Sequence, residues 1–370
     1  MNPSKSDKFI KAKIRINGAL NSGDNPKLEK VLLGGIGAEL NDSLHIIDEH
    51  KENDLLKLYF LLNSLSVNNV FKRFELYKQI IGHIANEQSF FENYEFYKLF
   101  SSILTKLKRD TRKLKDYDFE YIETNISELR RLFNPLRRAQ FFRCLANVLS
   151  TLFFLYFKLQ QFHQSSFLLP MISNMDKVLE NSETIDRVCL CYYLARLAVL
   201  NDELYEAAEY LEKAMKISHK YVTRRKIMRF FVIIKLRLRI FPTYEALKHY
   251  KLDDYIDLVS SVRNGNYSLF EKTCLNNREK WMKLGIYYIL GDLESLLIRN
   301  LVRRLHLLSK SRLIRLEVIQ NSLNLNRQHS FCDTSVLNLL ASLISRNIID
   351  GKLKMKTQVL QLAKEDAFPI

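Results

Sequence analysis

Three lysines at alternate positions near the C-terminal end are the residues best suited to bind a polyanion. Lys352, Lys354 and Lys356 are separated by single apolar residues. Because side chains alternate between the two faces of a β-strand, this spacing places the three ammonium groups on one face. Such a row could contact successive phosphates of a nucleic acid, and Arg346 lies shortly before it. Lysines that protect an exposed strand edge against aggregation give the same pattern, so both interpretations stay open.

Two further groups of arginines are candidates for a partner interface, with an acidic protein or a nucleic-acid backbone as the partner. Within each group the spacing allows side chains to share a helix face, although a solvated helix face gives the same pattern. The candidates are Arg224, Arg225, Arg229, Arg299, Arg303 and Arg304. Base-specific readout is not supported, because the last helix expected before the lysines exposes only Asn338, Ser342 and Ser345. We expect binding that is independent of sequence and sensitive to salt.

The positive charge is concentrated in the C-terminal part of the chain. The net charge of the 370 residues is +16, and residues 220–370 hold 27 Lys or Arg against 13 Asp or Glu, a balance of +14. This asymmetry favours an acidic partner, either nucleic acid or an acidic protein segment.

No arrangement of residues typical of a catalytic, metal or cofactor site is apparent. The five cysteines have no C-x-x-C spacing, and the eight histidines form no H-E-x-x-H motif. A GGIG segment at residues 34–37 lacks the remaining residues of a dinucleotide or P-loop motif. The sequence therefore predicts a protein that is not an enzyme, with no cofactor and no small-molecule substrate. Free thiols fit a reducing compartment, the nucleus or the cytoplasm.

The composition predicts long helices. Only 10 glycines and 6 prolines occur, which leaves few turn signals. Residues 145–157 are the most apolar stretch, but a membrane span needs about 20 apolar residues, so we expect a buried helix and no membrane contact. Pro135 and Pro170 are expected to interrupt helices. Around residues 192–217, two helical patterns with small alanines on one side flank a break at Asn201 and Asp202, where an N-cap is expected.

The last segment changes from helical to strand periodicity. Residues 312–323 and 336–348 have helical patterns, Asp350 and Gly351 indicate a tight turn, and residues 352–356 and 359–362 are expected to pair as strands. Helices followed by a two-stranded hairpin predict a winged helix. The fold class is mainly α, a TPR-like helical-repeat solenoid followed by a C-terminal winged-helix domain. We predict an arm (1–30), N-terminal repeats (31–180), a TPR-like part (181–300) and the winged helix (301–370).

Several short blocks between residues 192 and 369 carry a resemblance to a known family. They are YYLAR (192–196) with EAAEYL (206–211), FPT (241–243) with LKHYKL (247–252), VRNGN (262–266), RNL (299–301) with Arg303-Arg304, and IIDG (348–351) with AFP (367–369). In order and spacing they resemble PCI-domain proteins. The resemblance is strongest to two subfamilies: PCI domain-containing protein 2, a subunit of the TREX-2 messenger-RNA export complex, and the twelfth-subunit-like signalosome proteins.

The resemblance implies a nuclear, non-catalytic complex subunit, with the cytoplasm as a second location. Its implied partners are a Sac/GANP-type scaffold protein, a small acidic Sem/DSS-type protein, and RNA or DNA bound without sequence preference. The alternative is a structural subunit of a COP-9 signalosome-like or proteasome-lid-like assembly that binds no nucleic acid.

Overall fold

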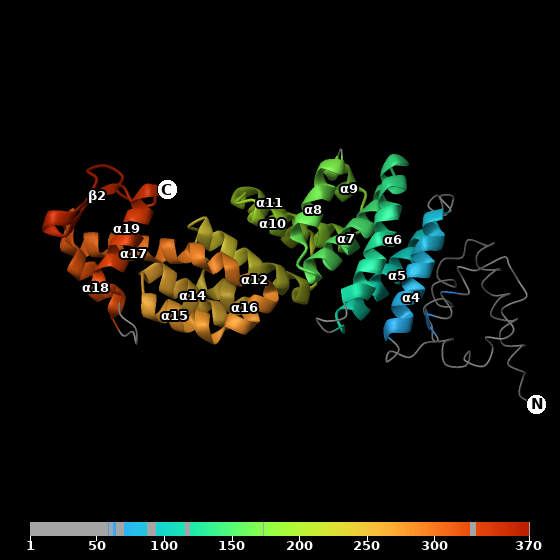
Figure 1. The fold of residues 1–370 in the computed structure, drawn as a ribbon, viewed down its shortest axis with the longest axis horizontal. Helices are drawn as coiled ribbons and strands as arrows, with labels where there is room; N and C mark the ends of the chain where they lie inside the picture. The colour runs from blue at the N-terminus through green and yellow to red at the C-terminus, as the bar shows by residue number, and fades with distance from the viewer. Residues whose placement is uncertain are drawn as a thin grey trace, which may run out of the picture. The chain divides into compact units, whose positions relative to one another are not determined.

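The fold is mainly α-helical, as the sequence predicted (Figure 1). A computed structural model describes residues 58, 62–63, 70–86, 94–114, 119–172, 174–325 and 331–369. The predicted arm (1–30) and the glycine-rich segment at 34–37 lie outside these residues. The chain divides into two compact units, Met1–Tyr193 and Leu194–Ile370, and the boundary falls within helix α10 (Thr184–Leu200). The domain boundaries proposed from the sequence stay predictions.

The described part of the first unit is a stack of amphipathic helices. They are α4 (Val70–Asn86), α5 (Tyr94–Thr111), α6 (Phe119–Arg138), α7 (Phe142–Lys158), α8 (Phe162–Leu168), the 3-10 turn η5 (Leu169–Met171), α9 (Met175–Glu180) and the start of α10. Helix α7 packs against both α5 and α6, and α6 also packs against α4 (Figure 1). Nearly all of α7 is buried, which confirms the buried helix expected at residues 145–157. Among the described helices, none is long and apolar enough to cross a membrane.

The interruption predicted at Pro135 is wrong. Pro135 lies inside α6, three residues before the helix ends at Arg138. Proline has no N–H to donate to the carbonyl one turn earlier, but its own carbonyl still accepts a hydrogen bond from Ala139 (3.0 Å). Burial of Leu132, Phe133 and Leu136 around it offsets the missing hydrogen bond. Pro170, by contrast, sits in η5, where α8 has already ended.

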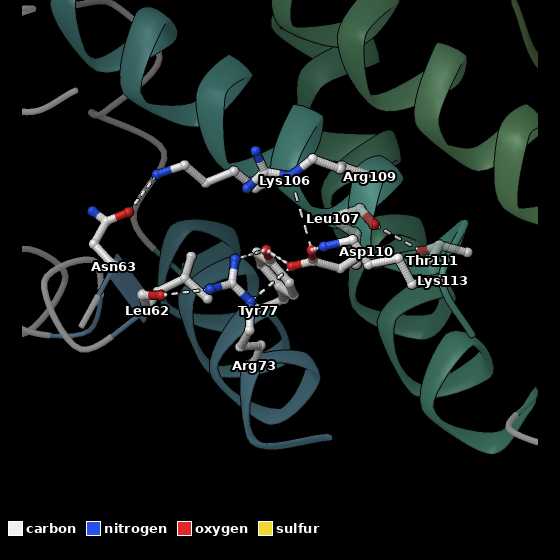
Figure 2. A network of polar contacts seen from close by, with 10 residues as sticks. All are labelled: Leu62, Asn63, Arg73, Tyr77, Lys106, Leu107, Arg109, Asp110, Thr111 and Lys113. Atoms are coloured by element: carbon white, nitrogen blue, oxygen red, sulfur yellow. Dashed lines mark hydrogen bonds and ion pairs between the residues drawn. The ribbon is translucent and has the colours of Figure 1, made fainter. Parts of the chain in front are cut away.

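A buried ion pair joins α4 and α5 (Figure 2). The guanidinium Nε of Arg73 lies 2.8 Å from Oδ2 of Asp110, and both side chains are at most 6% exposed. The phenol of Tyr77 donates to the same oxygen (2.7 Å), and Arg73 Nη1 donates to the carbonyl of Leu62 (3.1 Å). Burial raises the pKa of Tyr77 far above its ordinary value, so the phenol keeps its proton and remains a donor.

The helical part of the second unit is a second layered stack. It comprises α11 (Leu204–Ile217), α12 (Tyr221–Arg237), α13 (Tyr244–His249), α14 (Asp253–Asn264), α15 (Tyr267–Asn276), α16 (Arg278–Leu284), the 3-10 turn η6 (Tyr287–Ile289) and α17 (Leu290–Ser309). Helix α11 packs on α12, and α14 packs between α15 and α17. The alanines expected on the inner side, Ala207, Ala208 and Ala214, are buried, so the small side chains lie at the packed face of α11.

The break after α10 differs in detail from the prediction. Glu203 is the N-cap of α11 and makes no side-chain capping bond. Asp202 adopts a left-handed conformation (φ 64°), and its carboxylate accepts a hydrogen bond from Arg237 of α12 (2.7 Å). The acid expected to cap the helix therefore ties the loop to the neighbouring helix instead.

The chain ends in a winged helix, which confirms the predicted fold. It consists of β1 (Leu313–Arg315), α18 (Leu316–Asn324), α19 (Asp333–Ser345), β2 (Gly351–Lys354), the 3-10 turn η7 (Met355–Thr357) and β3 (Val359–Leu362). The three strands form one antiparallel sheet in the order β1-β3-β2. Helix α18 packs on α19, and α19 packs on β2.

Three details of this region were predicted wrongly. The helix expected from residue 312 begins at Leu316, because the preceding three residues form β1. The first hairpin strand ends at Lys354, and the hairpin turn is η7 with Gln358 in a left-handed conformation. Gly351, which was expected to form a tight turn with Asp350 before the first strand, begins β2 instead. A Cβ there would lie 2.6 Å from the carbonyl oxygen of Gln361, so the close approach of β3 requires glycine.

Candidate nucleic-acid interface

The outer face of the three-stranded sheet brings basic residues from both of its edges together. In the antiparallel register, Lys352 is opposite Gln361 and Lys354 is opposite Val359, both on the central strand β3. On the other side of β3, Arg315 is also opposite Val359. Since directly opposed residues point to the same face of a sheet, the two lysines and Arg315 share one face.

Burial agrees with this assignment of faces. Lys352, Lys354 and Arg315 are exposed, whereas Ile314 and Leu360, which pair between them in the register, are buried on the inner face. Neighbouring strands lie about 4.8 Å apart, so Arg315 and Lys354 flank β3 at a separation of about 10 Å. None of the outer-face residues is acidic; they are Leu313, Arg315, Lys352, Lys354, Val359 and Gln361. A polyanion lying along β3 would meet cations on both sides.

Arg315 is the residue of this face that the sequence did not reveal. Strand β1 has only three residues, and the apolar spacing that follows is helical, so the whole segment resembled one helix. The pairing of β1 with β3 is a contact between residues more than forty positions apart. No local pattern contains that information.

Lys356 does not continue the row that its spacing predicted. It lies in η7, between the two paired strands, and is exposed. It is therefore part of the turn at the tip of the hairpin rather than of the paired sheet face.

Arg346 lies immediately after α19, five residues before the start of β2. Its side chain is exposed, and its Nη1 donates to the hydroxyl of Ser295 on α17 (3.1 Å). The guanidinium is thus directed to α17, and it is not held on the sheet face by that bond. The exposed positions predicted on α19, at Asn338, Ser342 and Ser345, are exposed in the structure.

The arginines expected at a partner interface on α12 are half-buried. Arg225 donates to the carbonyl of Lys251 (2.8 Å), which ties α12 to the loop after α13. The Nε atoms of Arg224, Arg225 and Arg229 are buried without a hydrogen-bond partner among the described residues. Their charged ends are therefore only partly available, and exposed Lys220 and Lys226 complete the basic character of this helix start.

The arginines expected at a partner interface on α17 differ from one another. Arg299 is only 6% exposed, and its Nη2 donates to the carbonyl of Phe368 (2.7 Å). Burial, followed by repulsion from Arg239 and Arg303, lowers the pKa of Arg299 to about 10. Arg303 is exposed, and exposed Arg304 donates to the carbonyl of Asn264 (3.2 Å). Arg299 thus holds the C-terminal segment of the chain, whereas Arg303 faces solvent.

Three of the blocks that carried the family resemblance, VRNGN, RNL and AFP, are in contact with one another. Asn300 of α17 donates to the carbonyl of Val262 at the end of α14 (2.8 Å). Gly265 ends α14 at φ 68°, and a Cβ there would lie 2.6 Å from the backbone of Leu301. These residues join the α14–α15 turn to α17, and Arg299 then joins α17 to the tail at Phe368. Residues of these three blocks therefore contribute to the packing of the second unit.

In the part of the chain that the structure describes, no three His, Cys, Asp or Glu side chains are grouped so that they could hold a metal ion. All five cysteines lie within the described ranges, and no disulfide joins any two of them.

Comparison with known proteins supports the family suggested by the sequence. The chain is 26% identical over 225 residues to the PCI domain-containing protein 2 homolog of Caenorhabditis briggsae, covering 60% of this chain and 54% of that protein. It is 28% identical over 192 residues to Enhanced ethylene response protein 5 of Arabidopsis thaliana (50% and 46%), and 23% identical over 245 residues to Protein CSN12 homolog of Gibberella zeae (60% and 54%). No protein-family model matches the chain.

A helical-repeat stack that ends in a winged helix, together with these relatives, supports a PCI-domain protein. The relatives with this similarity include proteins named PCI domain-containing protein 2 and Protein CSN12 homolog. The chain spans about half the length of the curated relatives it matches.

Proposed function

We propose that the chain is a non-catalytic subunit of a TREX-2-like complex in the nucleus, which binds nucleic acid during transcription-coupled mRNA export. In this proposal it binds a Sac/GANP-type scaffold and a small acidic Sem/DSS-type protein. The observation that carries the nucleic-acid part is the outer sheet face, where Arg315, Lys352 and Lys354 flank β3 without an acid among them. Because no base-reading side chains accompany these cations, binding is independent of sequence.

Salt-dependent binding of the full chain to labelled single-stranded RNA tests this part of the proposal. Removing one cation that binds a phosphate lowers the slope of log K against log salt by about 0.7. The variant Lys352→Gln/Lys354→Gln should therefore lower the slope by about 1.4 and weaken binding about tenfold at moderate salt. The matched control Lys72→Gln/Lys177→Gln removes the same charge from exposed positions of the first unit and should change little. Equal effects of both pairs would assign the weaker binding to net charge and remove the sheet face from the site.

A second candidate function is supported by the similarity to Protein CSN12 homolog. In this alternative the chain is a structural subunit of a COP-9 signalosome-like or proteasome-lid-like assembly, and the winged helix contacts protein only. Affinity purification of the tagged chain, with and without nuclease, separates the two. A Sac/GANP-type scaffold that survives nuclease supports the export subunit, whereas recovery of signalosome or lid subunits supports the alternative.

A further inference from the structure

A second surface of the second unit combines exposed tyrosines with lysines. We call it the tyrosine–lysine surface and define it by Lys220, Tyr221, Tyr244, Lys248 and Lys251, at the start of α12 and on and just after α13. Tyr221 is 41% exposed and Tyr244 is 50% exposed, and the three lysines are exposed as well. Exposed aromatic rings beside cations can bind a ligand both by stacking and by charge.

Contacts between α12 and the end of α13 order one side of this surface. The phenol of Tyr221 donates to the carbonyl of His249 (2.8 Å), and its ring stacks on Tyr250 with 15° between the ring planes. Arg225 donates to the carbonyl of Lys251 (2.8 Å). These bonds fix the start of α12 against the end of α13, so the ring of Tyr221 is held in place before any ligand arrives. A ring that is already ordered loses little conformational entropy on binding.

The second tyrosine is paired with a cation. The ammonium of Lys248 lies 4.6 Å from the centre of the Tyr244 ring, one helical turn away on α13. Half of the surface of Tyr244 remains exposed. The acids nearest in sequence are Glu245 and Asp253, both exposed. Residues 220–254 hold ten Lys or Arg against three Asp or Glu, so this part of the chain is basic.

We propose that the tyrosine–lysine surface binds single-stranded RNA, with unpaired bases stacking on the two tyrosines and phosphates contacting the three lysines. Every base has a π face, so stacking on aromatic rings adds affinity without sequence preference. A duplex hides those faces, and an acidic peptide would need the lysines but not the tyrosine rings. The combination therefore fits an unpaired strand best. This inference shares its ligand class with the proposed function but does not depend on the winged-helix face.

The test is fluorescence anisotropy of the full chain with a labelled oligouridylate of about 12 nucleotides, a length in the range of single-strand binding sites, at several salt concentrations. Tyr244→Leu keeps an apolar side chain but removes the ring, and should weaken binding about tenfold. Lys248→Gln/Lys251→Gln should lower the salt slope by about 1.4. Tyr205→Leu is the matched aromatic control, since Tyr205 is 81% exposed and lies between Glu203 and Glu206. Lys213→Gln is the charge control. Thermal melts verify that each variant folds.

The outcomes separate this surface from the winged-helix face. Weaker binding by Tyr244→Leu, but not by Tyr205→Leu, supports the proposal. Wild-type affinity of Tyr244→Leu overturns it, even if the lysine pair weakens binding, because a surface that uses only charge fits an acidic protein. Equal affinity for a duplex of the same length, unaffected by Tyr244→Leu, overturns it too. If Lys352→Gln/Lys354→Gln abolishes RNA binding while Tyr244→Leu does not, the proposed function stands and this inference fails. If Tyr244→Leu weakens RNA binding while Lys352→Gln/Lys354→Gln does not, this inference stands and the winged-helix face is not the RNA site.

Discussion

The two units of the chain use their charged residues in opposite ways. In the first unit, acids are buried with partners: Asp110 is paired with Arg73, and Asp186 accepts hydrogen bonds from Asn147 and Ser150 with Lys108 3.7 Å away. In the second unit, cations on the sheet face and on the tyrosine–lysine surface are exposed. Charges that are buried and paired contribute to packing, whereas exposed cations remain available to a ligand.

The largest expected effect comes from breaking the buried ion pair of Arg73 and Asp110 in the first unit. Asp110→Ala leaves the guanidinium of Arg73 buried without its carboxylate, which should cost about 3–5 kcal/mol in the free energy of unfolding of the first unit. Urea denaturation followed by far-UV circular dichroism measures this. Glu75→Ala is the control, because Glu75 is an exposed acid of the same unit and its pair with Lys78 is loose (4.0 Å), so a change within about 0.5 kcal/mol is expected.

A double variant sharpens the interpretation of that destabilisation. Arg73→Leu/Asp110→Leu removes both charges, and should be less destabilised than Asp110→Ala, because no uncompensated charge remains buried. If the double variant is instead the less stable of the two, the hydrogen bonds of Arg73 to Leu62 and of Tyr77 to Asp110 contribute more than the ion pair itself.

The next effect concerns the packing that carries the exposed surfaces. Gly265→Ala should destabilise the second unit by about 2 kcal/mol, because φ 68° is unfavourable for alanine and its Cβ would meet the backbone of Leu301. Thermal unfolding checks this. Gly291→Ala is the control on α17: a Cβ there meets nothing within 4 Å, so alanine should stabilise the helix by about 0.5–1 kcal/mol. A neutral Gly265→Ala would mean that the α14–α15 turn can relax away from α17.

The sequence could reveal features that depend on local patterns, but not those that depend on contacts between distant residues. Local patterns identified two elements: the apolar run at residues 145–157 indicated the buried helix α7, and strand alternation indicated the hairpin of the winged helix. The pair of Arg73 with Asp110 joins residues 37 positions apart, and β1 becomes a strand only through β3. Arg299 resembled the neighbouring exposed arginines, although its chain of contacts runs to Phe368, 69 residues away. Burial of a charged side chain depends on such distant partners, which spacing does not encode.

A smaller effect tests which cations of the outer sheet face contact RNA. Arg315→Gln should weaken RNA binding roughly two- to fivefold and lower the salt slope by about 0.7, because Arg315 shares the outer face with Lys352 and Lys354. Lys356→Gln removes the same charge from η7, off the paired strands, and should have the smaller effect. Anisotropy titrations of both variants at matched salt give the comparison. A larger decrease in affinity for Lys356→Gln would place the RNA at the hairpin tip. It would also mean that β1 completes the sheet without contributing to RNA binding.

The smallest expected effect is a difference in reactivity between a buried thiol of the first unit and an exposed thiol of the second unit. Cys144 is buried in α7 of the first unit, and burial raises its pKa to about 12. Cys332 is exposed just before α19 in the second unit, and hydrogen bonds with Ser335 and Thr334 (3.0 Å each) lower its pKa to about 7. The thiolate is the reactive form, so Cys332 should react with iodoacetamide at neutral pH while Cys144 stays unmodified.

The alkylation rate of Cys332 should increase with pH. A thiol whose pKa is lowered to about 7 is mostly thiolate by about pH 8, so its alkylation rate should rise from pH 6 and level off there. Peptide mass spectrometry over pH 6–9 follows each cysteine separately. Ser335→Ala removes the hydroxyl that contributes most to the lowered pKa and should move the plateau to higher pH without unfolding the chain. A wild-type rate that still rises steeply between pH 8 and 9 would show that the hydroxyls do not stabilise the thiolate.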